Sequence, residues 1–222
     1  MKQKRSLWQS VAGFFKDTSP FMIKVERIAL LAELNLCLLL CSLPAITAGA
    51  ALTALHATLL QFSTLTYGSA FKAFFRAFWQ AVRSTFLLWL LTLVAAGALG
   101  AGWYTVLVSQ LTDNFSVMLP LLLSSAVVLF TAVWLYPLAA AQLYNGTIRR
   151  AKELLSDAFL LGLKELPRSF GGLLLTLAPA ALLLWACAVS VTAVGVWVLF
   201  GISPFALCHS FLVKSIIFPE EK

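Results

Sequence analysis

Three polar residues interrupt the first long apolar stretch of the chain and could do chemistry inside a membrane. Glu33, Asn35 and His56 lie among aliphatic residues between positions 28 and 62. An ionisable side chain at the centre of a bilayer costs at least about 2.5–3.5 kcal/mol, and residues that persist there commonly line a solute or proton pathway. These three residues are therefore the candidate polar site within the membrane.

Their spacing leaves two interpretations open. If residues 26–65 form a hairpin that turns near position 46, His56 pairs with position 37, which is one helical turn from Glu33 and Asn35. The three side chains would then lie close to one another. In the alternative, Glu33 lies near enough to the inner membrane surface to reach water or a basic residue, and it has no functional role.

Recognised catalytic patterns are absent from the sequence. It contains no His-Glu-x-x-His, no Gly-x-Ser-x-Gly, no phosphate-binding glycine loop and no paired intramembrane aspartates. His209 is the only histidine of the last apolar run, where a packing role is expected. The four cysteines lie within apolar runs and match no metal-site spacing. The sequence therefore predicts no enzyme activity, no cofactor and no metal.

Composition predicts the elements that must hold these residues. Hydrophobic residues make up 61% of the 222 residues and charged residues 11%, whereas a soluble domain carries about 25% charged residues. Residues 28–62 contain one charge, Glu33, and residues 169–213 contain none. About 20 apolar residues suffice for one helical crossing, so each stretch is long enough for more than one. The predicted fold class is all-α, a polytopic helical membrane protein that forms a single integral membrane domain over residues 1–222.

The positions of the basic residues predict the topology. Lys and Arg occur in groups separated by apolar stretches, and basic residues in short loops stay on the cytoplasmic side. An even number of crossings must therefore separate successive groups. This requirement predicts about six transmembrane helices arranged as three hairpins, near 26–65, 85–142 and 169–212, with both termini cytoplasmic.

The first hairpin depends on two residues that interrupt helices. Pro44 disfavours helical geometry at the preceding residue, and Gly49 readily adopts turn conformations. The sequence therefore predicts a turn at 42–48 between two short spans. A re-entrant pair that dips into the bilayer over 26–65 gives the same parity and remains an alternative.

Amphipathic segments precede the hairpins on the predicted cytoplasmic side. In residues 71–83, phenylalanines recur at helical spacing, and Lys72, Arg76 and Arg83 occupy the opposite face. This pattern predicts an interfacial helix with its aromatic face in lipid and its cations toward anionic headgroups. The basic N-terminal segment 1–27 and residues 148–166 show related patterns. The lipid bilayer, and not nucleic acid, is thus the predicted partner of the basic residues.

The stretch LNLCLLLCSLPAITAGAALTALH resembles the signature of the YesL-like family of bacterial integral membrane proteins, a domain of unknown function. The residues that carry the resemblance are Asn35 in the first span and the turn residues Leu43, Pro44, Thr47 and Gly49. FKAFFRAFWQAVRSTFLLWLL and GLKELPRSF resemble later parts of the family pattern, so the resemblance covers nearly the whole chain. It implies a multi-pass protein of the bacterial cytoplasmic (inner) membrane, in a family associated with carbohydrate-uptake ABC transport systems.

Two functional hypotheses follow. The first is a non-catalytic accessory or regulatory subunit associated with a carbohydrate ABC uptake system, with permease subunits or further copies of the chain as partners. The second is a small oligomeric transporter or channel whose pathway contains Glu33, Asn35 and His56.

Overall fold

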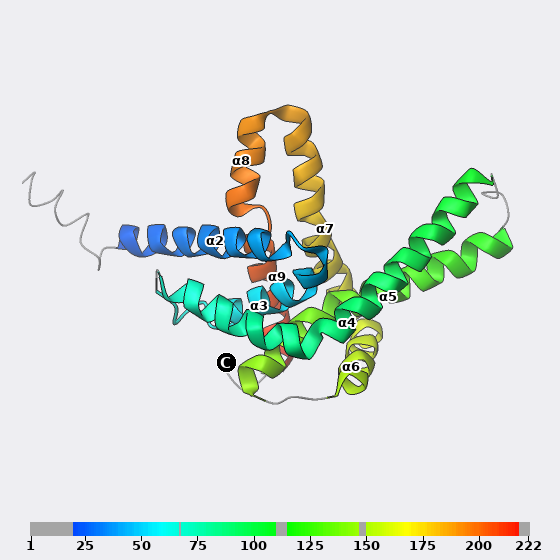
Figure 1. Cartoon of the computed structure of the whole chain (residues 1–222), viewed down its shortest axis with the longest axis horizontal. Coiled ribbons are helices and arrows are strands. Elements are labelled where there is room, and N and C mark those ends of the chain that lie inside the picture. Colours follow the sequence, from blue (N-terminus) through cyan, green and yellow to red (C-terminus); the bar gives the residue numbers. More distant parts are fainter. Residues whose placement is uncertain (1–19, 67, 110–114, 147–149, 218–222) are drawn as a thin grey trace, which may run out of the picture.

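The computed structural model describes residues 20–66, 68–109, 115–146 and 150–217, and every regular element in these ranges is a helix (Figure 1). In chain order the elements are α2 (Pro20–Ser42), the 3-10 helix η1 (Ala45–Thr47), α3 (Ala48–Leu60), α4 (Ser69–Val108), α5 (Phe115–Asn145), α6 (Ala151–Lys164), α7 (Leu166–Val189), α8 (Val191–Phe200) and α9 (Ser203–Ile217). Of the predicted N-terminal segment 1–27, residues 20–27 begin α2, and the rest lies outside the described residues.

Four helical stretches in the described ranges are long and apolar enough to cross a membrane. They are Ser69–Val108, Phe115–Asn145, Leu166–Val189 and Val191–Ser215, the last of which contains α8 and most of α9. An all-α chain with such stretches agrees with the predicted class of helical membrane protein. That both helices of the predicted first hairpin cross the membrane stays a prediction, because α2 is outside this group and α3 has only 13 residues. At 1.5 Å per residue α3 is about 20 Å long, shorter than a bilayer core of about 30 Å.

Helix α3 lies at the centre of the molecule, in contact with α2, α4, α5 and α9 (Figure 1). Nearly every residue from Gly49 to Leu59 is buried. Ala50, Ala51 and Ala54 present small side chains that allow neighbouring helices to approach closely. Helices α2 and α3 thus form much of the packing core.

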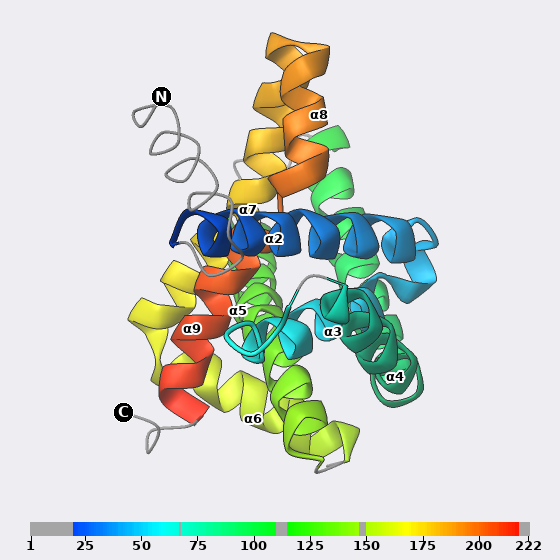
Figure 2. The same cartoon turned by 90° about the vertical axis from the view of Figure 1, so that its left-hand side faces the viewer.

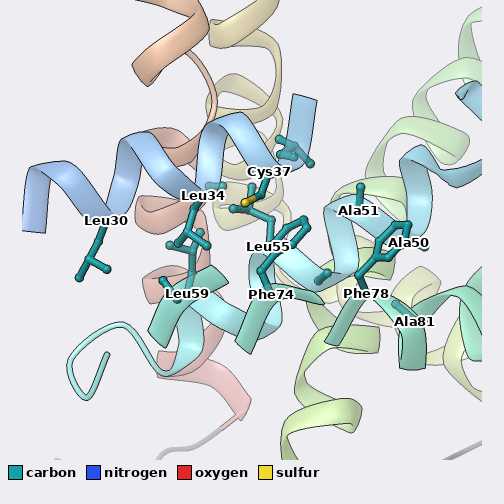
Figure 3. Close-up of a cluster of buried hydrophobic side chains, with 14 of the residues drawn as sticks. Leu30, Leu34, Cys37, Ala50, Ala51, Leu55, Leu59, Phe74, Phe78 and Ala81 are labelled. Carbon is teal, nitrogen blue, oxygen red and sulfur yellow. The ribbon is translucent and has the colours of Figure 1, made fainter. Parts of the chain in front are cut away.

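Helix α4 is continuous over 40 residues and combines the predicted interfacial helix with the predicted span that follows it. Phe74 is fully buried and Phe78 is 8% exposed, and both pack with Leu34 of α2 and Leu55 of α3 in one hydrophobic cluster (Figure 3). The prediction that this aromatic face lies in lipid therefore needs correction at these two phenylalanines. Helical amphipathicity looks the same whether the apolar face meets lipid or protein.

The cationic face of the same helix is open. Lys72, Arg76 and Arg83 are all exposed. Their predicted contact with anionic headgroups stays a prediction.

The chain reverses between α2 and α3 at residues 43–47. The Thr47 hydroxyl donates to the carbonyls of Cys41 (2.6 Å) and Pro44 (2.9 Å), and the Nε1 of Trp89 on α4 donates to the Ala45 carbonyl at 2.7 Å. At the other end of the pair, the Arg27 guanidinium donates to carbonyls that follow α3. Both ends of the antiparallel α2–α3 pair are thus fixed by side-chain hydrogen bonds.

Two hairpins project from this core in different directions (Figure 1). One pairs α4 with α5, and the other pairs α7 with α8. Figure 2 shows the second hairpin extending to one side of α2, while α9 lies on the other side. Large apolar side chains on both hairpins are exposed, including Leu123 at 59% and Leu184 at 74%, as expected for surfaces that face lipid.

Candidate functional site

Glu33 joins α2 to the beginning of α4. Its Oε1 accepts a hydrogen bond from the backbone N–H of Phe71 at 3.2 Å, and a carboxylate at a helix N-terminus also interacts favourably with the helix dipole. Its Oε2 is buried without a hydrogen-bond partner among the described residues. This arrangement gives Glu33 a capping role, which neither of the interpretations of the sequence includes.

Asn35 is fully buried and holds the break between α8 and α9. Its Nδ2 donates to the carbonyls of Val198 (2.7 Å) and Trp197 (3.5 Å), which end α8. Its Oδ1 accepts from the backbone N–H groups of Ile202 and Ser203, both at 3.0 Å, which begin α9. One amide side chain therefore binds backbone groups on both sides of an interrupted helix, although the Trp197 carbonyl also accepts from the Gly201 N–H within the helix.

Local sequence explains why the helix breaks here. Pro204 has no N–H group to donate to the carbonyl four residues earlier, which weakens the helix here, although α5 and α7 continue through Pro137 and Pro179. Gly201 ends α8 at a point where a Cβ would lie 2.5 Å from the Trp197 carbonyl oxygen. The Ser203 hydroxyl then donates to the Leu31 carbonyl at 2.8 Å, which ties the start of α9 to α2.

His56 of α3 and His209 of α9 form a buried pair, 7% and 5% exposed. The two rings meet edge to face with centroids 5.5 Å apart. His56 Nδ1 lies 2.9 Å from the Ser210 hydroxyl, which leaves Nε2 as its second polar atom. His209 makes no hydrogen bond in the part of the chain that the structure describes, although most buried polar side chains have a partner.

The histidine pair forms part of the wall of a cavity of about 380 Å³, called here the histidine cavity. Its lining comes from α3, α7, α8 and α9 and consists of Leu52, His56, Leu175, Thr176, Pro179, Ala180, Leu183, Trp197, Ile202, Phe205, Ala206 and His209. The polar side-chain groups in an otherwise aliphatic and aromatic lining are two imidazoles, a threonine and the Trp197 indole N–H. Such a site suits a small, uncharged molecule with a few polar groups.

Two features of α7 shape this cavity. A Cβ at Gly172 would lie 2.9 Å from His209 Nε2 and 2.7 Å from Val133 Cγ1, so glycine allows the histidine to pack against the helix backbone. Further along, the Trp197 indole donates to the Pro179 carbonyl at 2.8 Å. Helix α8 is therefore fastened to α7 at the cavity and to α2 through Asn35.

The structure gives the three predicted site residues separate partners. Asn35 and His56 both contact the α8–α9 segment, whereas Glu33 contacts α4. Contacts with residues far along the chain, and not pairing across the first hairpin, thus organise the site. Gly201 and Pro204, spaced like a helix end and a helix start, were the available signal for the break.

The turn residues of the predicted family pattern have structural roles. Leu43 is 79% exposed, Pro44 precedes η1 with extended backbone angles, and Thr47 holds the turn as described above. Gly49 lies inside α3, where a Cβ would meet the Trp89 side chain at 2.7 Å. Glycine is needed here for close helix packing and not for a turn conformation.

Comparisons with known proteins add no relative: scans of protein-family models, curated proteins and solved structures find no match to the chain.

Proposed function

We propose that this protein is a small transporter or channel that binds an uncharged solute in the histidine cavity. The observation that carries the proposal is His209, a buried histidine in the cavity wall whose ring nitrogens bond to no protein group in the described residues. Among the described residues only Glu33 Oε2 is a fully buried side-chain polar atom without a partner, so the His209 ring nitrogens are not sealed by protein. A solute bound in the cavity would form hydrogen bonds with them. This observation favours the transporter hypothesis over the accessory-subunit hypothesis.

The interrupted helix α8–α9 supports the same function. In many transporters, solute sites lie where a membrane helix is broken and its backbone groups face a cavity. Here Trp197 and Ile202, on either side of the break, both line the histidine cavity. A small rearrangement of the Asn35 hydrogen bonds would move α8 relative to α9 and change access to the cavity.

The topology that we propose has six crossings as three hairpins, in a bacterial cytoplasmic membrane with both termini cytoplasmic. Helix α2 has 23 residues, about 35 Å, and is long enough to cross. Helix α3 is too short to cross without local thinning of the bilayer, so the re-entrant form of residues 26–65 is retained within the proposal. Two crossings and a re-entrant pair over residues 26–65 both leave the basic residues on the cytoplasmic side of the membrane.

Uptake of uncharged polyols by proteoliposomes tests the proposal. Swelling in iso-osmotic glycerol, erythritol and xylitol is followed by light scattering, and we expect faster entry than into protein-free vesicles. Ala180 lines the cavity, so Ala180→Trp should reduce entry to the protein-free rate.

Leu184→Trp is the matched control, because Leu184 lies one turn further along α7 and is 74% exposed. This variant should keep the wild-type rate. Entry at the protein-free rate for all three polyols, or equal entry through wild type and Ala180→Trp, would contradict the proposal.

An accessory role is the second candidate, and one observation favours it. On the projecting part of α4, a Cβ at Gly97 or Gly100 would meet nothing within 4 Å, so this face is open to a close-packed helix. Specific co-purification of carbohydrate ABC permease subunits from the host in mild detergent, lost in Gly97→Leu and retained in Gly171→Leu, would support this role. Recovery of the chain without them would count against it.

Membership of the YesL-like family is part of the proposal and is carried by the motif around Pro44. The proposed function is non-enzymatic and requires no cofactor, since binding in the cavity needs only the polar groups already there.

A further inference from the structure

A second pocket, of about 250 Å³, lies between α2, the chain after α3, and α9. Unlike the histidine cavity, it contains formal positive charge. Its polar lining is Arg27, Ser63, Ser210 and Lys214, and its apolar walls include Phe62 and Phe211.

The guanidinium of Arg27 is held rigidly at this pocket. It donates to the carbonyls of Phe62 (2.5 Å), Leu65 (3.0 Å) and Ser63 (3.0 Å), and it lies over the Phe62 ring at 5.4 Å from the centroid. These bonds use three of the five N–H groups of a guanidinium. Among the described residues no salt bridge joins Arg27 to a carboxylate.

Lys214 supplies the second charge. It lies in the last turn of α9 and is half-buried at the rim of the same pocket. The two cations thus come from opposite ends of the sequence and meet where α2 and α9 approach the predicted cytoplasmic face.

We propose that this pocket binds the phosphate of an anionic phospholipid. Two cations and two hydroxyls match a phosphate diester, since rigid arginine N–H groups are well suited to phosphate oxygens. At about 250 Å³ the pocket is much larger than a single-water cavity, which leaves room for glycerol beside the phosphate.

The apolar surroundings favour a lipid over free phosphate as the source. Phe211 is 60% exposed on a helix within the candidate span Val191–Ser215, so the pocket is continuous with a surface expected to face acyl chains. Basic pockets between membrane helices on the cytoplasmic side commonly bind lipid headgroups. The inference is independent of any solute in the histidine cavity.

Native mass spectrometry of the full-length protein, released from mild detergent, tests this site. With phosphatidylglycerol and phosphatidylcholine supplied at equal concentration, we expect one phosphatidylglycerol to bind preferentially. Lys214→Gln should weaken this binding about fivefold, the effect of one basic residue near a membrane surface. Arg27→Gln should weaken it further, but Arg27 also holds the chain after α3, so Lys214→Gln is the decisive variant.

Lys72→Gln is the matched control, because Lys72 is exposed on α4 and does not line the pocket. Equal losses in Lys214→Gln and Lys72→Gln would mean a diffuse electrostatic attraction and would overturn the site. Inorganic phosphate is added in a parallel measurement. If it binds alone and displaces phosphatidylglycerol completely at millimolar concentration, the pocket is a free-phosphate site and the lipid assignment fails.

Discussion

At the scale of single residues, hydrogen-bonding capacity explains what Asn35 contributes. A carboxamide is both donor and acceptor, and the break between α8 and α9 presents carbonyls on one side and N–H groups on the other. Neither Asp nor Leu at this position could satisfy both sets. The polar residue in the first apolar stretch is thus matched to a defect about 165 positions further along the chain.

We expect Asn35→Leu to lower the free energy of unfolding by about 2 kcal/mol or more, because buried backbone groups at the break lose their partners. Thermal unfolding of the detergent-solubilised protein measures the change. Leu36→Ala is a suitable control, since Leu36 is 39% exposed on the same helix. Equal unfolding midpoints for Asn35→Leu and wild type would show that the Asn35 hydrogen bonds to the α8–α9 break are not needed for stability.

A second residue-scale prediction compares two adjacent glycines of α7. Gly172→Ala should destabilise the protein by about 1–3 kcal/mol, because the new methyl group would overlap Val133 and His209. Gly171→Ala should be neutral or stabilising by up to about 1 kcal/mol, since nothing lies within 4 Å of its Cβ position. The unfolding midpoints of the two variants test this difference. Equal changes in midpoint would contradict the close packing of His209 against Gly172.

At the scale of elements, close approach between helices decides which residues are tolerated. Helix α3 contacts four neighbouring helices, so its alanines and Gly49 act as a surface on which larger side chains rest. The aromatic residues of α4, among them Phe74 and Trp89, fill the space that these small residues leave. The amphipathic first part of α4 is therefore a core helix on one face and a cationic surface on the other.

We expect Gly49→Ala to separate α3 from α4 and to destabilise the protein by about 1–3 kcal/mol. The added Cβ would lie 2.7 Å from the Trp89 side chain, and a displaced indole would also lose its hydrogen bond to Ala45. Gly97→Ala, at an open position of α4, is the control and should not lower the midpoint. A normal unfolding midpoint in Gly49→Ala would mean that the contact between α3 and α4 tolerates repacking.

At the scale of the whole molecule, one orientation in the membrane must place the exposed apolar helices in lipid and the basic residues on the cytoplasmic side. The four candidate spans expose large apolar side chains, and the basic residues Lys72, Arg76 and Arg83 of α4 and Lys152 and Lys164 of α6 are exposed as well. In the proposed topology the α7–α8 turn at Ser190 is outside and the end of α5 at Asn145 is inside.

Single cysteines at these two positions, in a background without the four native cysteines, test that orientation. Both positions are exposed in the structure. A thiol reagent that cannot cross the cytoplasmic membrane should label Ser190→Cys in intact spheroplasts, and Asn145→Cys only after permeabilisation. Labelling of Asn145→Cys in intact spheroplasts would disprove the parity on which the six-crossing proposal depends.

The sequence by itself determined the class of the protein and the approximate position of most helices. Long apolar runs without charge require lipid or protein around them, and this requirement is readable from composition alone. The sequence predicts a hairpin near 169–212, and within that range the chain turns at Ser190, between α7 and α8. Composition also identifies Glu33, Asn35 and His56, because they are polar residues within a long apolar run.

Only the tertiary structure decided what those exceptions contact. Asn35 and His56 find partners more than 150 positions away, and no local pattern encodes such pairings. The aromatic face of α4 could not be assigned to protein or lipid from periodicity, since both are apolar. The histidine cavity likewise exists only where α3, α7, α8 and α9 meet, because a cavity is a property of packed neighbours and not of any one helix.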